Sequence, residues 1–109
     1  MGTGEWIQAP VSDTPLSCTE ACQAANRGQC NEAMLNSITN QEEFTEVVTG
    51  LGIDTCTFFT GYGGNEFVPY VEGGDCSWSS DASAKCDAQP PSDRTDTTRL
   101  CFCESGKRS

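Results

Sequence analysis

The chain has 109 residues, a net charge of −10 and no histidine. Its length fits one domain, and its acidic balance disfavours nucleic acids and anionic membranes as partners because like charges repel. Leu, Ile, Val and Phe make up less than a fifth of the residues, a composition that without cross-links is typical of disordered chains.

Eight cysteines change this interpretation. An even cysteine count in a small, acidic chain favours disulfides and an extracellular location: secreted, at the cell surface or in the cell wall. Four bridges at about 2–4 kcal/mol each could supply the stability that a thin core lacks. Zinc or iron–sulfur ligation is the alternative, but the spacings Cys18-x3-Cys22 and Cys101-x-Cys103 do not match the usual Cys-x-x-Cys pattern.

We therefore predict a small disulfide-rich α+β fold, with two or three short helices packed on a small antiparallel sheet and long disulfide-pinned loops. Residues 1–16 are expected to form an extended N-terminal arm, because Pro10 and Pro15 prevent a helix, and Trp6 is expected to be buried against the domain. Met1 leads directly into polar residues without a signal-peptide pattern, so we expect a mature domain. Residues 17–103 are predicted to form a single domain, followed by a flexible tail over residues 104–109.

The first two helices are short. Ser17 and Glu20 form a capping box, in which each side chain accepts a hydrogen bond from a backbone N–H at the helix start. The helix is predicted over about residues 18–27. A second helix, capped by Asn31, is predicted over residues 31–35.

The third helix has the clearest signal. Residues 39–42 form a second capping box, and glycines end the helix at positions 50 and 52. Apolar side chains recur on one face, which predicts the main core contact. They are Phe44, Val47, Val48 and Leu51.

The second half of the chain has the composition of strands and loops. Strands are predicted over residues 56–60 and 99–103, and a short edge strand over residues 68–71, because Pro69 cannot donate to a ladder. Residues 72–98 are rich in Gly, Ser, Asp, Pro and Thr, so we expect one long loop there, pinned by cysteines.

The cysteine positions suggest a connectivity, although eight cysteines allow 105 pairings. Cys18 and Cys22 lie one turn apart on one helix face, and Cys101 and Cys103 lie on one face of the last strand. We expect these two pairs to join and clamp the first helix onto that strand. The remaining bridges are then predicted to be Cys76–Cys86, across the long loop, and Cys30–Cys56, which would hold the third helix.

The order of these features resembles a cysteine-rich extracellular module that recurs in secreted and cell-surface proteins of algae and other protists. The resemblance covers nearly the whole chain, from Trp6 and Ser17-Cys18-x3-Cys22-x7-Cys30 to Arg99-Leu100-Cys101-x-Cys103. The opening half is also similar to the cysteine-rich C-terminal segment of the Golgi N-acetylglucosaminyltransferases that branch N-glycans, without their catalytic domain. These resemblances imply an extracellular module for adhesion or recognition, and they imply no catalytic residue.

An enzyme is not expected. Without histidine, the Ser-His-Asp and Cys-His arrangements are excluded, and with sixteen acids no single carboxylate pair is informative about hydrolase chemistry. No cofactor is expected except weakly bound calcium. Calcium is a candidate because oxygens stand at every second residue from Asp75 through Asp81 to Ser83, as in loop-type calcium sites. The series lacks the Gly and Glu of an EF-hand, and the alternative is a plain Ser-rich loop.

Aromatic residues interleaved with glycine form the candidate recognition surface. Rings on disulfide-held loops offer contact area for a sugar or a protein at low entropic cost. We expect Tyr62, Tyr70 and Trp78 to be the exposed ligand-binding set. The alternative is that members of the group, such as Phe58 and Phe67, simply fill the small core.

Two functions remain open. The first is a non-enzymatic extracellular binding or adhesion module that recognises a glycan or a protein, either as a monomer or as one module of a larger protein, without membrane insertion. The second is a freestanding secreted signalling ligand, such as a pheromone or a growth-factor-like protein. Small, acidic and disulfide-rich chains occur in both classes, and we favour the first.

Overall fold

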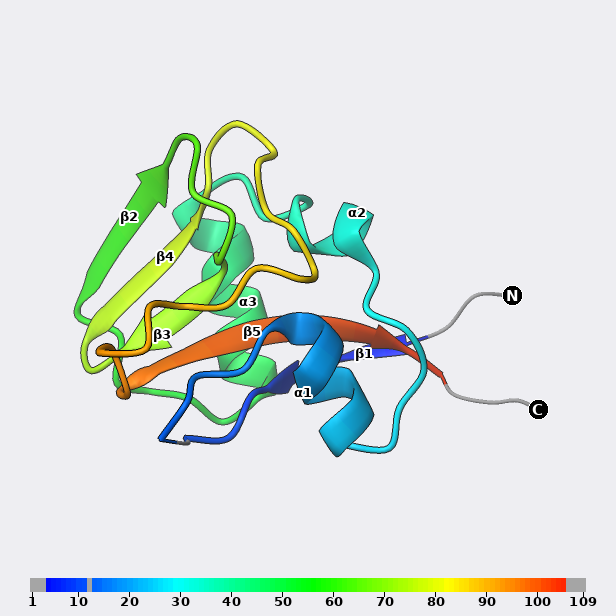
Figure 1. The fold of residues 1–109 in the computed structure, drawn as a ribbon. Helices are drawn as coiled ribbons and strands as arrows, with labels where there is room; N and C mark the ends of the chain where they lie inside the picture. The colour runs from blue at the N-terminus through cyan, green and yellow to red at the C-terminus, as the bar shows by residue number, and fades with distance from the viewer. Residues whose placement is uncertain (1–3, 12, 106–109) are drawn as a thin grey trace.

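The computed structural model describes residues 4–11 and 13–105. Its strands form one five-stranded sheet in the order β1-β5-β3-β4-β2 (Figure 1). The longest strand, β5, is almost entirely buried and pairs with β1 on one side and β3 on the other. In chain order the strands are β1 (Gly4–Gln8), β2 (Phe58–Tyr62), β3 (Tyr70–Glu72), β4 (Asp75–Ser79) and β5 (Thr97–Glu104).

Helices lie on both faces of the sheet. In Figure 1, α1 (Cys18–Ala24) lies in front of β5 and α3 (Gln41–Gly50) lies behind the sheet, while α2 (Glu32–Leu35) is a single turn. Successive strand residues face opposite sides, so on β5 Cys101 belongs to the α1 side and Leu100 to the α3 side. The predicted disulfide-rich α+β fold is confirmed. None of these helices is long and apolar enough to cross a bilayer.

The start of α1 is the predicted capping box. Ser17 Oγ accepts a hydrogen bond from the Glu20 N–H (3.1 Å), and the Glu20 carboxylate accepts one from the Ser17 N–H (3.0 Å). The helix ends earlier than the predicted residue 27, because Asn26 adopts a left-handed conformation with φ of 60°.

The cap of α3 lies one residue later than predicted. Asn40, rather than Thr39, is the N-cap, and its side chain accepts from the Glu43 N–H (2.9 Å). The Glu43 carboxylate accepts bonds from the Thr39 N–H and hydroxyl, and these bonds lower the pKa of Glu43. The predicted apolar stripe is confirmed, with Phe44 and Val48 buried and Val47 and Leu51 half-buried.

Three sheet predictions are wrong. The sheet is mixed rather than antiparallel, because β2 joins it beyond the β3–β4 hairpin and runs parallel to β4. The segment predicted as an edge strand is β3, which lies in the interior of the sheet, and Pro69 stands before its first residue, where no donor is needed. Residues 72–98 are not one loop, since β4 forms within them.

The predicted arm and tail contribute strands. Residues 4–8 form β1, and the half-buried Trp6 packs edge-on against Phe102, with ring centroids 5.5 Å apart. Glu104, predicted to begin the tail, is the last residue of β5. Ser105 follows the strand, and residues 106–109 of the predicted tail lie outside the described residues.

Two of the four predicted disulfides are confirmed. Cys18 bonds to Cys101 and Cys22 to Cys103, so α1 is clamped onto β5. The other two predicted pairings are wrong, because the alternation of β4 turns Cys76 toward α3, away from Cys86 on the α1 side. The bridges formed are Cys30–Cys86 and Cys56–Cys76.

A buried arginine anchors the loop between β4 and β5. Arg99 is fully buried on β5, and its guanidinium donates hydrogen bonds to the carbonyls of Val68, Lys85 and Ala88. Burial lowers the pKa of Arg99 to about 9, which is still above neutral pH, so the side chain stays charged. The bonds to Lys85 and Ala88 hold the loop between β4 and β5, which is the yellow-to-orange segment that passes in front of β3 and β4 in Figure 1.

The α3 stripe predicts the effect of core substitutions. Val48 is 4% exposed, so Val48→Ala should lower the free energy of unfolding by about 1–3 kcal/mol while the protein stays folded. The half-buried neighbour Val47 serves as the matched control, and Val47→Ala should have the smaller effect. Urea denaturation followed by circular dichroism measures both. Equal losses would show that α3 does not pack as described.

The disulfides should differ in reactivity, because exchange requires access of a thiolate to the sulfur. Cys30 and Cys86 are both partly exposed, whereas the bridges to Cys101 and Cys103 are buried at both ends. A dithiothreitol titration, followed by alkylation and peptide mapping, should therefore label Cys30 and Cys86 first. Labelling of Cys101 or Cys103 at lower dithiothreitol would contradict the clamp as the protected part of the fold.

Candidate functional site

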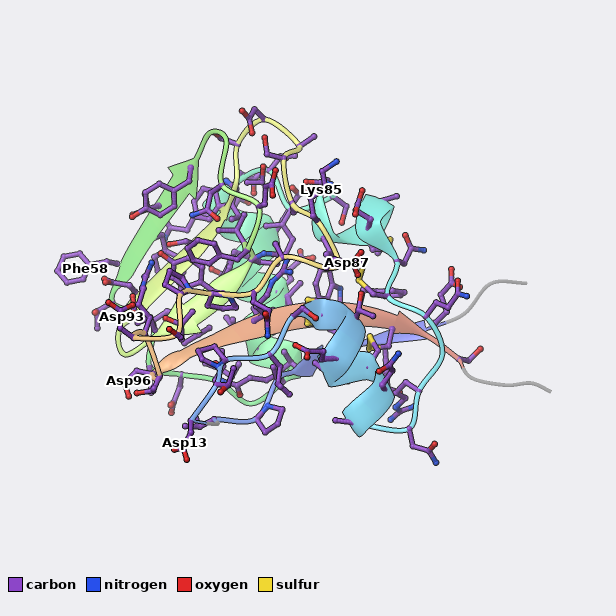
Figure 2. The ribbon with its side chains drawn as sticks, in the orientation of Figure 1. Asp13, Phe58, Lys85, Asp87, Asp93 and Asp96 are labelled. Atoms are coloured by element: carbon purple, nitrogen blue, oxygen red, sulfur yellow. A yellow bond between two sulfur atoms is a disulfide. The ribbon has the colours of Figure 1, made fainter. Side chains whose placement is uncertain are left out.

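The outer face of β2 carries the most exposed aromatic residues of the sheet. Phe58, Thr60 and Tyr62 alternate along the strand on the α1 side; Phe58 is 68% exposed and Tyr62 is 41% exposed. Figure 2 shows Phe58 projecting away from the ribbon. We call these three side chains the β2 face.

The opposite side of β2 is anchored in the core. The Phe59 ring packs edge-on against Phe44, with centroids 6.2 Å apart. Gly61 makes room for Trp78, because a Cβ on Gly61 would lie 2.9 Å from the indole nitrogen. The Cys56–Cys76 disulfide ties the start of β2 to β4. The β2 face is therefore presented by a strand whose position is fixed from behind.

An aromatic–arginine stack borders the β2 face. Phe67 and Tyr70 stack with centroids 5.5 Å apart, and the guanidinium of Arg94 lies 5.4 Å and 5.2 Å from the two ring centres. Glu72 holds Arg94 through a bidentate ion pair, with one N–O distance of 3.0 Å. The Tyr70 hydroxyl also accepts a hydrogen bond from Arg94. Tyr62 and Tyr70 lie on the same side of the sheet, and the nearby Tyr70 raises the pKa of Tyr62.

The structure corrects the predicted ligand-binding set. Tyr62 is exposed as expected, but Tyr70 is 3% exposed and Trp78 is 9% exposed, so the expectation of exposure is wrong for both. Phe58, which the alternative interpretation placed in the core, lies on the open face. The alternation of Phe58, Thr60 and Tyr62 against Phe59 and Gly61 indicates which residues share a face of the strand, but not which of the two faces is covered.

The predicted calcium residues do not meet. Asp75 begins β4 and Asp81 lies beyond its end, because the alternating oxygens belong to an extended strand rather than to a loop curled round an ion. Asp81 accepts hydrogen bonds from the Ser83 hydroxyl, the Gly64 N–H and the Ser79 hydroxyl, which lower its pKa. Within residues 4–11 and 13–105, no cluster of three or more His, Cys, Asp or Glu side chains could hold a metal ion.

The Glu72–Arg94 pair predicts a pH dependence of stability. Hydrogen bonds from Arg94 lower the pKa of Glu72, whereas burial raises it. The bond from the Thr97 hydroxyl also lowers this pKa, and the net shift is downward. A lowered pKa means that the pair stabilises the fold above the ordinary Glu value of about 4.3, and that this contribution is lost as pH falls through the lowered value. Glu72→Gln should therefore reduce stability at pH 7 by about 1 kcal/mol.

Urea denaturation between pH 2 and pH 7 measures this difference. The stability gap between the wild type and Glu72→Gln should narrow as the solution becomes acidic. Glu42→Gln, at an exposed position with no cationic partner in the part of the chain that the structure describes, is the control and should leave stability almost unchanged. A Glu72→Gln gap that stays constant down to pH 2 would contradict the ion pair.

Comparison with known proteins does not assign this site to a family. No protein-family model and no curated protein matches the sequence. The resemblance to the cysteine-rich module of algal and protist proteins therefore stays a prediction, and the functional argument depends on the geometry of the β2 face.

Proposed function

We propose that this protein is a non-enzymatic extracellular binding module that recognises its partner through the β2 face. Four disulfides are typical of extracellular proteins and support that location. The observation that carries the proposal is the exposure of Phe58 and Tyr62 on one side of the same strand. Single exposed apolar residues are ordinary, whereas neighbouring exposed aromatics on one surface favour an interaction site.

The anchoring of β2 supports a binding role. Phe59 and Trp78 pack against Phe44 behind the strand, so the open rings are presented without ordering a loop. A preorganised aromatic surface loses little conformational entropy when a partner binds. Thr60, between the two rings, adds a hydroxyl that can donate or accept a hydrogen bond.

The test is retention of the labelled protein on the extracellular material of the cells that produce it. Phe58→Ala and Tyr62→Ala should each weaken retention about tenfold, because buried aromatic contacts at the centre of an interface contribute at least about 1.4 kcal/mol. Both residues are exposed, so circular dichroism and melting temperature should stay close to the wild type.

Val11→Ala is the matched control. Val11 is 73% exposed and follows β1, at the opposite edge of the sheet from β2. It should bind like the wild type. If Phe58→Ala and Tyr62→Ala are retained like the wild type, the β2 face is not the recognition surface. The same conclusion follows if Val11→Ala loses as much retention as they do.

A further inference from the structure

The outer edge of β2 is unpaired in the part of the chain that the structure describes. β2 pairs only with β4 there: the Phe58 N–H donates to Gly74 O (3.0 Å), and Tyr62 O accepts from the Ser80 N–H (2.8 Å). Backbone groups of successive strand residues point to opposite neighbours. The N–H and C=O groups of Phe59 and Gly61 therefore point to the open edge, which leaves two donors and two acceptors for another strand.

Nothing in β2 protects this edge. Edge strands are usually protected by Lys, Pro, bulges or a covering segment, and the sequence Phe58–Tyr62 has no charge and no proline. The other edge strand, β1, differs because it carries Glu5, which forms an ion pair with Arg27 (2.7 Å). Of the two edges, that of β2 is the one suited to strand addition.

The negative charge near β2 and over the whole protein indicates which kind of added strand would bind. Asp75 stands beside Phe58 in the register with β4, and Asp81 binds the Gly64 N–H just beyond Tyr62, so a carboxylate lies near each end of β2. The chain as a whole has a net charge of −10, which opposes pairing between two copies. A basic segment would be attracted toward both ends of the strand.

Within the described residues, the protein's own cationic side chains do not compete with a basic partner for β2. Arg27, Lys85 and Arg94 are paired with carboxylates, and Arg99 is buried. An added strand that alternates in the usual way would place every second side chain beside the rings of Phe58 and Tyr62. Lysine or arginine at those positions would gain a cation–π contact in addition to the backbone bonds.

We propose that β2 accepts an extended, basic polypeptide segment as a sixth strand of the sheet. The inference rests on the proposed function, because it uses the same strand, and it specifies the partner as a polypeptide rather than a glycan. The backbone of the segment bonds to Phe59 and Gly61, and its basic side chains lie over Phe58 and Tyr62.

The probe is a synthetic peptide of alternating Lys and Val, about nine residues long, so that it exceeds the strand. Amide exchange measured by NMR should show the Phe59 and Gly61 N–H groups slowed at least about tenfold on binding. A peptide of the same sequence, N-methylated on the alternate residues whose N–H groups would face β2, keeps its charges and loses the backbone donors that would bond to β2. It should bind at least about tenfold more weakly, and a Glu–Val peptide should not bind.

Thr60→Lys tests the same edge from the protein side. It adds a lysine to the exposed side of β2, which should weaken binding of the Lys–Val peptide about tenfold. Thr49→Lys, at an exposed position of α3, makes the same change of net charge and should weaken binding much less. Both variants should melt close to the wild type.

Equal binding of the plain and N-methylated peptides, equal effects of the two lysine variants, or no peptide binding would overturn strand addition. The proposed function fails separately. If Phe58→Ala abolishes retention on extracellular material while no peptide binds, the β2 face still recognises a partner, but that partner is not an added strand.

Discussion

Two buried disulfides, Cys18–Cys101 and Cys22–Cys103, fix α1 to one face of β5. The chain has few large apolar residues, so packing alone would leave β5 without a stable cover on this side. Cross-links between segments more than eighty residues apart close long loops and restrict the unfolded chain, which is where a disulfide contributes most. Arg99, on the same face of β5, then holds the loop that covers β3 and β4 through the carbonyls of Lys85 and Ala88.

The strands are held less firmly toward the β2 edge of the sheet than at β5. β3 is held between β5 and β4, whereas β2 has a neighbour on one side only and depends on Cys56–Cys76 and on Phe59 for its position. The alternation of the strand separates two roles. Phe59 and Gly61 face the core and fix the strand, while Phe58 and Tyr62 remain available to a partner. The stabilising and the exposed side chains therefore lie on opposite faces of the same five residues, while the backbone groups of Phe59 and Gly61 point to the open edge.

The sequence predicted the parts of this structure that depend on local pattern. The Ser17–Glu20 box, the apolar stripe of α3 and the clamp on β5 follow from spacings within one helix or one strand. β4 was missed because Ser77 and Ser79 have a loop-like composition, and they are buried only because β4 lies between β2 and β3 in the sheet. The remaining disulfides, the burial of Arg99 and the exposure of Phe58 depend on which face of the sheet is covered, which no local pattern contains.

Native-state hydrogen exchange on the free protein tests this account most directly. The amides of β5 from Leu100 to Cys103 should exchange slowest, at the rate of global unfolding, because they lie beneath the disulfide clamp. The amides of Phe59 and Gly61 should exchange much faster, because they point to an open edge. Slow exchange at Phe59 and Gly61 in the free protein, or faster exchange in β5 than at those two amides, would contradict a clamped centre with an open recognition edge.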